Sequence, residues 1–124
     1  MRIGLPVAAT LLLAATCGTA QAMSARDLLR SCDAALRTIN GSSKRLSIAP
    51  AGQSCWNYME AVQDVVALGD EGGHRVLNVC VPEDGRIDGL VRAFTKYAHT
   101  HPDELESRAS VIVLRGLWAE FSCK

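Results

Sequence analysis

The sequence lacks an excess of charge of either sign. Its 124 residues include 13 Lys or Arg and 13 Asp or Glu, so the formal net charge is zero. A nucleic-acid-binding domain needs a basic surface to neutralise phosphates, and this composition excludes one of the usual kind. Charged residues make up 21% and apolar residues 48% of the chain, which is typical of a globular protein and not of a disordered one. The length allows one small domain.

The sequence also lacks the motifs that carry common enzyme chemistry. No serine stands in a G-x-S-x-G context, and no glycine-rich loop connects a strand to a helix. Glu60 and Asp64 form an i, i+4 acidic pair, but a solvated helix face explains such a pair without a catalytic cleft. We therefore predict no catalytic residue, no cofactor and no enzymatic activity.

Metal-ligand spacing is absent as well. A zinc site needs close pairs such as C-x-x-C or H-x-x-x-H, and the cysteines here stand far apart. His99 and His101 are two residues apart at the end of an expected helix, where side chains at i and i+2 point in different directions. The sequence therefore predicts no metal site.

The one long apolar run lies at the N-terminus. Arg2 precedes the apolar stretch Leu5–Ala15, and Ala20–Ala22 matches an A-x-A cleavage site, so residues 1–22 are interpreted as a secretory signal peptide cleaved after Ala22. A membrane-spanning helix needs about 20 apolar residues, more than this stretch supplies. A membrane anchor and lipidation of Cys17 are the weaker alternatives. We expect an exported domain of residues 23–124 that is not attached to the membrane.

Four cysteines remain after removal of the leader: Cys32, Cys55, Cys80 and Cys123. An even number of cysteines in a small exported domain predicts two disulfides, for which three pairings are possible. Oxidised cysteines leave no free thiol for nucleophilic catalysis.

Apolar side chains recur at helical spacing in four segments, which predicts an all-α fold: a small bundle of four main helices plus short helical turns. The helices are expected from Ser24 to Asn40, from near Ser54 to Gly69, from Asp84 to Thr100, and from Ser107 to Ala119, with a short turn after Pro102. Ser24 and Asp27 resemble a capping box. Residues 42–54 are expected to form a loop, and residues 76–81 an extended connector without a partner strand.

The disulfide pairing follows from this layout. Short connections make consecutive helices antiparallel neighbours. That arrangement favours the pairs Cys32–Cys55 and Cys80–Cys123. A Cys55–Cys80 bond is possible if the connector runs back along the second helix, and the arrangement with Cys32–Cys80 and Cys55–Cys123 ranks last.

Aromatic side chains are few, at 5% of the chain, and four of them stand near the cysteines: Trp56, Tyr58, Trp118 and Phe121. Most are expected in the core, because aromatic residues supply much of the buried area in small domains. Any of them that is exposed would mark a partner surface.

The cysteine-bearing segments resemble the periplasmic immunity proteins of type VI secretion amidase effectors, the Tai-type family. The resemblance covers essentially the whole chain after residue 22. It rests on the order and spacing of Asp27–Leu29 with Cys32, Cys55–Met59 with Ala61 and Asp64, Val79–Glu83, Leu90, Lys96–Tyr97, His101–Pro102, Arg108–Ala109, Leu117 and Phe121–Cys123. Ala61, Gly116 and Ser122 depart from the residues usual in that family, which are Gly, Ala and Pro.

The resemblance implies a small all-α periplasmic protein, often a homodimer, that sterically blocks a secreted cysteine amidase. A protruding segment of such a protein occupies the cleft of the enzyme. The candidate segment here is acidic, polar and bounded by ordered elements: Gly69, Asp70, Glu71, Gly72, Gly73, His74 and Arg75. Residues 42–54 and 101–106 are the alternatives. A general periplasmic helical binding or chaperone-like module without a toxin partner is the competing function.

Overall fold

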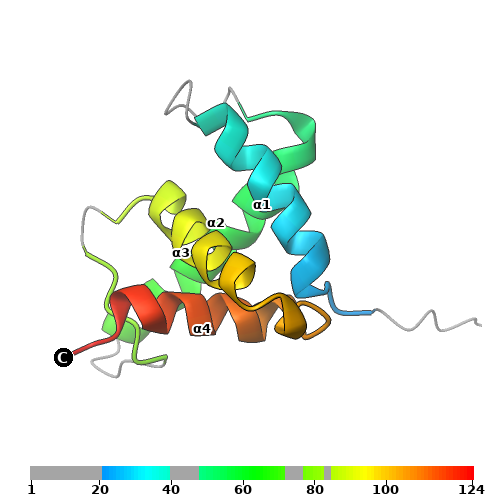
Figure 1. Cartoon of the computed structure of the whole chain (residues 1–124). Coiled ribbons are helices and arrows are strands. Elements are labelled where there is room, and N and C mark those ends of the chain that lie inside the picture. Colours follow the sequence, from blue (N-terminus) through cyan, green and yellow to red (C-terminus); the bar gives the residue numbers. More distant parts are fainter. Residues whose placement is uncertain (1–20, 40–47, 72–76, 83–84) are drawn as a thin grey trace, which may run out of the picture.

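The computed structural model describes residues 21–39, 48–71, 77–82 and 85–124, with the side chains of residues 69–71 left out. In these residues the fold consists of four α-helices and one short 3-10 helix (Figure 1). They are α1 (Ala25–Ile39), α2 (Pro50–Glu71), α3 (Ile87–Thr100), η2 (Pro102–Glu104) and α4 (Ala109–Phe121). Within these ranges β-structure is limited to two isolated bridges. The predicted all-α class is confirmed.

The start of α1 is fixed by the predicted capping box. The Ser24 hydroxyl accepts a hydrogen bond from the Asp27 backbone N–H at 3.2 Å and donates one to the Asp27 carboxylate at 2.8 Å. This satisfies a backbone donor that the first turn of a helix otherwise leaves unpaired. Beyond the cap, Leu28, Cys32 and Ala35 form the fully buried stripe that directs α1 against the core.

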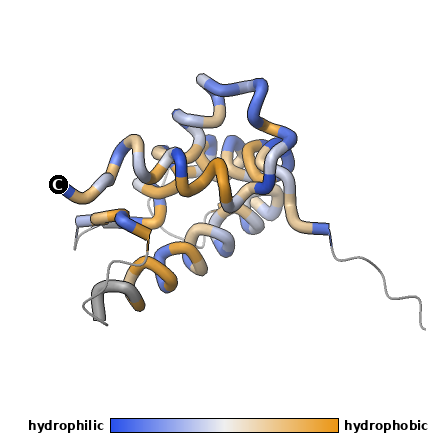
Figure 2. The backbone as a smooth tube through the Cα atoms, turned by 90° about the horizontal axis from the view of Figure 1, so that it is seen from below, coloured by the Kyte–Doolittle hydropathy of each residue, from blue (hydrophilic) through white to orange (hydrophobic). Residues whose placement is uncertain are grey.

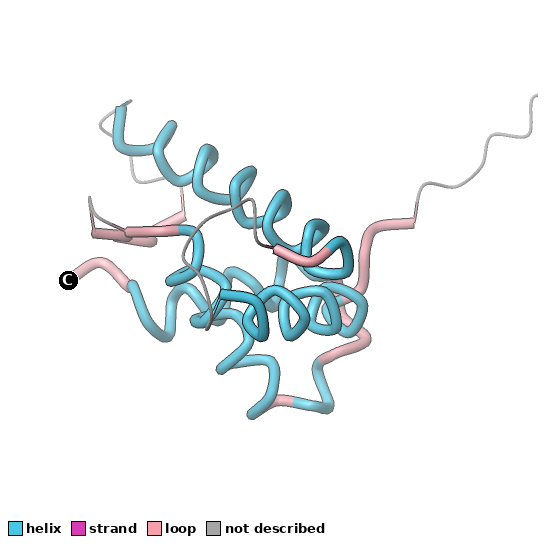
Figure 3. Tube along the Cα trace, turned by 90° about the horizontal axis from the view of Figure 1, so that it is seen from above, coloured by secondary structure: helices cyan, strands magenta, loops and turns pink. Residues whose placement is uncertain are grey.

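The helices pack as two pairs, and α3 connects one pair to the other. Contacts are most extensive between α1 and α2 and between α3 and α4, and α3 also touches α1 and α2. Figure 3 shows α2 as the longest helix, lying along one edge of the molecule. The helices α2 and α4 make few direct contacts, so neither helix covers the side of the other that faces it.

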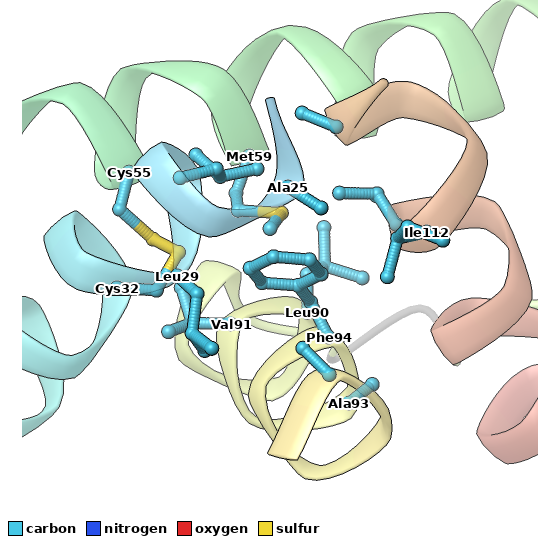
Figure 4. Packing of buried hydrophobic residues seen from close by; sticks show 14 of the residues in the cluster. Ala25, Leu29, Cys32, Cys55, Met59, Leu90, Val91, Ala93, Phe94 and Ile112 are labelled. Carbon is cyan, nitrogen blue, oxygen red and sulfur yellow. A yellow bond between two sulfur atoms is a disulfide. The ribbon is translucent and has the colours of Figure 1, made fainter. Parts of the chain in front are cut away.

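A single hydrophobic core joins all four helices. Phe94 of α3 is the largest side chain in it that is fully buried, and Figure 4 shows its ring near the centre of the cluster. The fully buried neighbours in the core come from every helix: Leu28 and Cys32 from α1, Cys55 and Met59 from α2, Leu90 and Val91 from α3, Ile112, Val113 and Leu117 from α4. None of the helices in the described ranges combines the length and apolarity that crossing a membrane requires.

Two disulfides hold the helices to one another and to the connector. Cys32–Cys55 joins α1 to α2 with a Cα–Cα distance of 4.9 Å, and Cys80–Cys123 joins residues 77–82 to the segment after α4 with a Cα–Cα distance of 5.0 Å. This is the pairing that the antiparallel layout favours. Cys32 and Cys55 are fully buried, whereas Cys80 and Cys123 are half-buried.

The ends of α2 differ from the prediction. The helix begins at Pro50 instead of near Ser54, and it continues to Glu71 instead of ending at Gly69. Proline is well tolerated in the first turn of a helix, because its missing N–H would have had no partner there. A glycine costs a helix only about 1 kcal/mol, so Gly69 alone does not stop it. The predicted loop 42–54 is therefore wrong for residues 50–54, and residues 42–47 lie outside the described residues.

The starts of α3 and α4 also shift toward the C-terminus. The helix α3 has Arg86 as its N-cap, and Asp84, the predicted cap, lies outside the described residues. The helix α4 begins at Ala109 and not at Ser107. Ser107 and Arg108 cannot be helical because their backbone pairs with the chain at the start of α1: the Ala25 N–H donates to the Ser107 carbonyl, and Arg108 forms a bridge with Ser24.

The described part of the connector, residues 77–82, lies against the end of α4. Val79 forms an isolated antiparallel bridge with Ser122, and the Cys80 N–H donates to the Phe121 carbonyl at 2.7 Å. Asn78 has a positive φ of 50°, a conformation that Asn tolerates better than most residues. A turn at Leu77 and Asn78 interrupts the extended course that was predicted for this connector. Residues 77–82 form no sheet strand, and the Cys80–Cys123 disulfide anchors them.

Gly52 sets how closely α1 and α2 approach, and Gly52→Ala tests it. A methyl group at Gly52 would lie 2.8 Å from both Cα and N of Ala35, whereas nothing lies within 4 Å of a methyl group at Gly89. We expect Gly52→Ala to lower the free energy of unfolding by about 1–3 kcal/mol, as overpacked cores do. The matched control Gly89→Ala should raise it by up to about 1 kcal/mol, because alanine favours helix. Urea denaturation measures both, and equal stabilities would contradict the expectation.

Candidate functional site

The predicted contact segment, residues 69–75, is only partly described. Gly69, Asp70 and Glu71 form the end of α2, so the segment begins on a helix that continues two residues beyond its predicted end at Gly69. Gly72, Gly73, His74 and Arg75 lie outside the described residues. The structure thus places the start of this segment on a helix that the Cys32–Cys55 disulfide holds to α1.

The alternative segment 101–106 is an ordered turn built around Glu104. The Glu104 carboxylate accepts hydrogen bonds from the Tyr97 hydroxyl at 3.4 Å and from the Arg115 guanidinium. Glu104 raises the pKa of Arg115 above its ordinary value by this hydrogen bond and by its charge. Glu106 pairs with Arg26 at 2.6 Å. These contacts tie the turn to α1, α3 and α4.

The two histidines that stand close in the sequence have separate partners. His99 Nε2 lies 2.9 Å from Asp33 Oδ1 on α1, and the His101 ring stacks on Tyr97 with ring centroids 4.0 Å apart. In the portion of the chain that the structure describes, no group of three or more His, Cys, Asp or Glu could hold a metal ion. His99 thus connects α3 to α1, whereas His101 packs on the last turn of α3.

An apolar groove lies between α2 and α4, where these helices make few direct contacts. Its volume is about 280 Å³. The residues that line it are uncharged: Tyr58, Ala61, Val62, Val65, Leu77, Ser110, Val113 and Leu114. Burial raises the pKa of the Tyr58 hydroxyl, and a hydrogen bond with Ser110 opposes that rise. We refer to this feature, defined by the eight residues above, as the α2/α4 groove.

Large apolar side chains remain exposed around the α2/α4 groove. Val65 is 46% exposed, Leu68 66%, Val111 40% and Trp118 45%. The Trp118 indole N–H donates to the carbonyl of Leu77, a groove residue, at 2.6 Å. Of the aromatic residues near the cysteines, Trp118 is the exposed one, while Trp56, Tyr58 and Phe121 are half-buried. The aromatic residues near the cysteines were the sequence feature that pointed to a partner surface. The groove itself could be located only once the helices were placed.

Comparison with known proteins identifies one matching family. The family model of the Rap1a immunity proteins matches residues 24–123. No curated protein and no solved structure matches the chain. The matched span begins at the Ser24 cap and ends at Cys123, so it includes all four helices and both disulfides. The chain therefore belongs to the Rap1a immunity protein family.

Proposed function

We propose that residues 23–124 form a periplasmic immunity protein that binds and sterically blocks a type VI secreted peptidoglycan amidase. The blocked enzyme would otherwise cleave the peptide stems of peptidoglycan in the producing cell or its kin. The observation that carries the proposal is the immunity-family match over residues 24–123, because it takes in the entire helical domain. The amidase as target rests on the resemblance of the cysteine-bearing segments to the Tai-type family.

The cysteines support a periplasmic location. Disulfides form and persist in oxidising compartments, including the bacterial periplasm, and the chain carries two of them. The signal-peptide pattern of residues 1–22 provides the route for export. Both features point to a protein that meets its partner outside the cytoplasm.

A stapled helical scaffold suits inhibition by binding. A rigid binder loses less conformational entropy on association than a flexible one, so more of its contact energy appears as affinity. Here one disulfide holds α2 to α1, and the other holds residues 77–82 to the end of α4. The two elements that flank residues 72–76 are therefore both fixed to the core.

Periplasmic co-expression with a candidate type VI amidase effector tests the proposal. The full chain should prevent lysis and co-purify with the effector, whereas a chain that lacks residues 1–22 should give no protection because it stays in the cytoplasm. Lysis despite good periplasmic expression of the full chain would reject this effector as the partner. That result would favour the competing function, a general periplasmic binding module.

We expect residues 69–75 to contact the effector. Combined replacement of Asp70, Glu71, His74 and Arg75 by alanine should weaken effector binding at least about tenfold, which corresponds to about 1.4 kcal/mol. The melting temperature should not change, because these positions lie at the end of α2 and beyond it. Isothermal titration calorimetry measures the affinity and calorimetric melting measures the stability. Unchanged affinity would move the contact to residues 42–54 or 101–106.

A further inference from the structure

We infer that the α2/α4 groove is a docking site for an uncharged, apolar segment of the effector protein. This inference rests on the proposed immunity function. It adds a second contact surface to the one proposed for residues 69–75. The groove is lined by side chains from α2, α4 and the connector.

Exposed apolar side chains are concentrated at this groove. Four of the five large hydrophobic residues that are exposed in the described part of the chain border it, and the fifth, Met23, precedes α1. Val65 lines the groove, and Leu68 follows one turn later on α2. On α4, Val111 and Trp118 lie one turn before and one turn after the lining residue Leu114, and Trp118 is hydrogen-bonded to Leu77. Figure 2 shows this end of α2 in the hydrophobic colour up to its grey last residues. Exposed apolar side chains gathered at one place are typical of an interaction site.

The charge pattern of the groove selects an apolar occupant. None of the eight lining residues carries a charge, and the polar side-chain groups among them are the hydroxyls of Tyr58 and Ser110. A charged group placed there would lose its hydration without gaining a partner. An apolar side chain would gain about 25 cal/mol for each Å² removed from water. The occupant that fits is an uncharged stretch with aliphatic or aromatic side chains.

The dimensions favour a protein segment over a small molecule. A volume of about 280 Å³ accommodates one or two large side chains and is at the lower end for a ligand pocket. A small molecule in the groove would leave Leu68, Val111 and Trp118 exposed around it. A protein surface that inserts a side chain can cover those three residues as well, with Trp118 and Tyr58 as the aromatic anchors that interfaces favour.

The walls of the groove are preformed, and the α2 wall leads to residues 69–75, the contact segment proposed above. The Cys32–Cys55 disulfide fixes α2, and the Cys80–Cys123 disulfide together with the Val79–Ser122 bridge fixes the segment that carries Leu77. Along α2, Val65 and Leu68 lead directly to Gly69, where the proposed contact segment begins. One effector molecule could therefore cover both surfaces without a rearrangement of the helices.

A matched pair of charge substitutions on α2 tests the inference. Val65→Glu places a carboxylate in the groove, and Ala67→Glu places one on an exposed position two residues away on α2 that does not line the groove. With the purified amidase effector of the co-expression experiment as the probe, we expect Val65→Glu to weaken binding at least tenfold. Ala67→Glu should change the dissociation constant less than twofold. Ser110→Glu, at an exposed position on the α4 side of the groove, provides a second test should Val65→Glu lower the melting temperature.

The outcomes separate this inference from the immunity function. Wild-type binding that survives both groove substitutions would overturn the groove as the docking site and leave the immunity function intact. The absence of any complex with the wild-type chain would reject the function, and the inference with it. Concentration-dependent self-association that Val65→Glu abolishes, without loss of effector affinity, would show that a second copy occupies the groove and would also overturn the inference.

Discussion

Replacement of Cys32 and Cys55 by alanine is expected to lower the free energy of unfolding by about 3–4 kcal/mol. The disulfide closes a loop across a sequence separation of 23 residues, so its loss frees the unfolded chain and favours unfolding. Both cysteines are also fully buried in the core, where the removed sulfur atoms leave space behind. A domain of this size has only about 5–15 kcal/mol of net stability. The melting temperature should fall by roughly 15–25 °C.

Thermal melts with and without a dithiol reductant provide the measurement. The reduced protein should be close to unfolded at room temperature, because both disulfides are then lost. Thiol access predicts the order of reduction: Cys80–Cys123 is half-buried and should be cleaved before the fully buried Cys32–Cys55, which mass spectrometry of alkylated peptides would show. Coincident melting curves in the presence and absence of reductant would contradict the expectation.

Phe94→Ala should cost about 3–5 kcal/mol, the range for a phenylalanine truncated in a packed core. Phe94 is fully buried on α3, which contacts each of the other three α-helices, as α1 also does. Its ring is near the centre of the core cluster (Figure 4), so the cavity would lie where no single helix can move to fill it without losing contacts elsewhere. The loss arises from lost burial and from the cavity together.

Urea denaturation of three variants checks this expectation. Phe94→Leu keeps most of the side-chain volume and should cost less than half as much as Phe94→Ala. Phe121→Ala removes the same ring from a half-buried position at the end of α4 and should likewise be milder. If Phe121→Ala destabilised the protein more than Phe94→Ala, the core would be centred near the Cys80–Cys123 disulfide and not on α3.

Effector binding and stability are expected to depend on different side chains. The core variants act on side chains that are buried between the helices, whereas Val65, the residue tested in the α2/α4 groove, is exposed. Surface substitutions usually change stability by less than about 0.5 kcal/mol. Loss of effector binding without loss of stability is therefore the result that assigns a surface residue to recognition.

The sequence alone determined the class of the fold, the capping box and the favoured disulfide pairing. Apolar residues at helical spacing predict helices whatever their neighbours are, because the period of 3.6 residues is a local property. The hydrogen bonds between Ser24 and Asp27 are likewise local. The pairing of Cys32 with Cys55 followed from one further rule, that short connections make consecutive helices antiparallel.

Only the tertiary structure decided where α4 begins and which apolar residues remain exposed. The backbone at Ser107 and Arg108 pairs with the start of α1, a partner more than 80 residues away, and no local signal reveals that competition. Val62 and Val65 are equally apolar in the sequence, yet the exposure of Val65 depends on whether α4 packs against α2. The helices α2 and α4 make few direct contacts, and the groove lies between them. Burial depends on neighbours that are distant in the sequence, so the groove could be recognised only after the helices were placed.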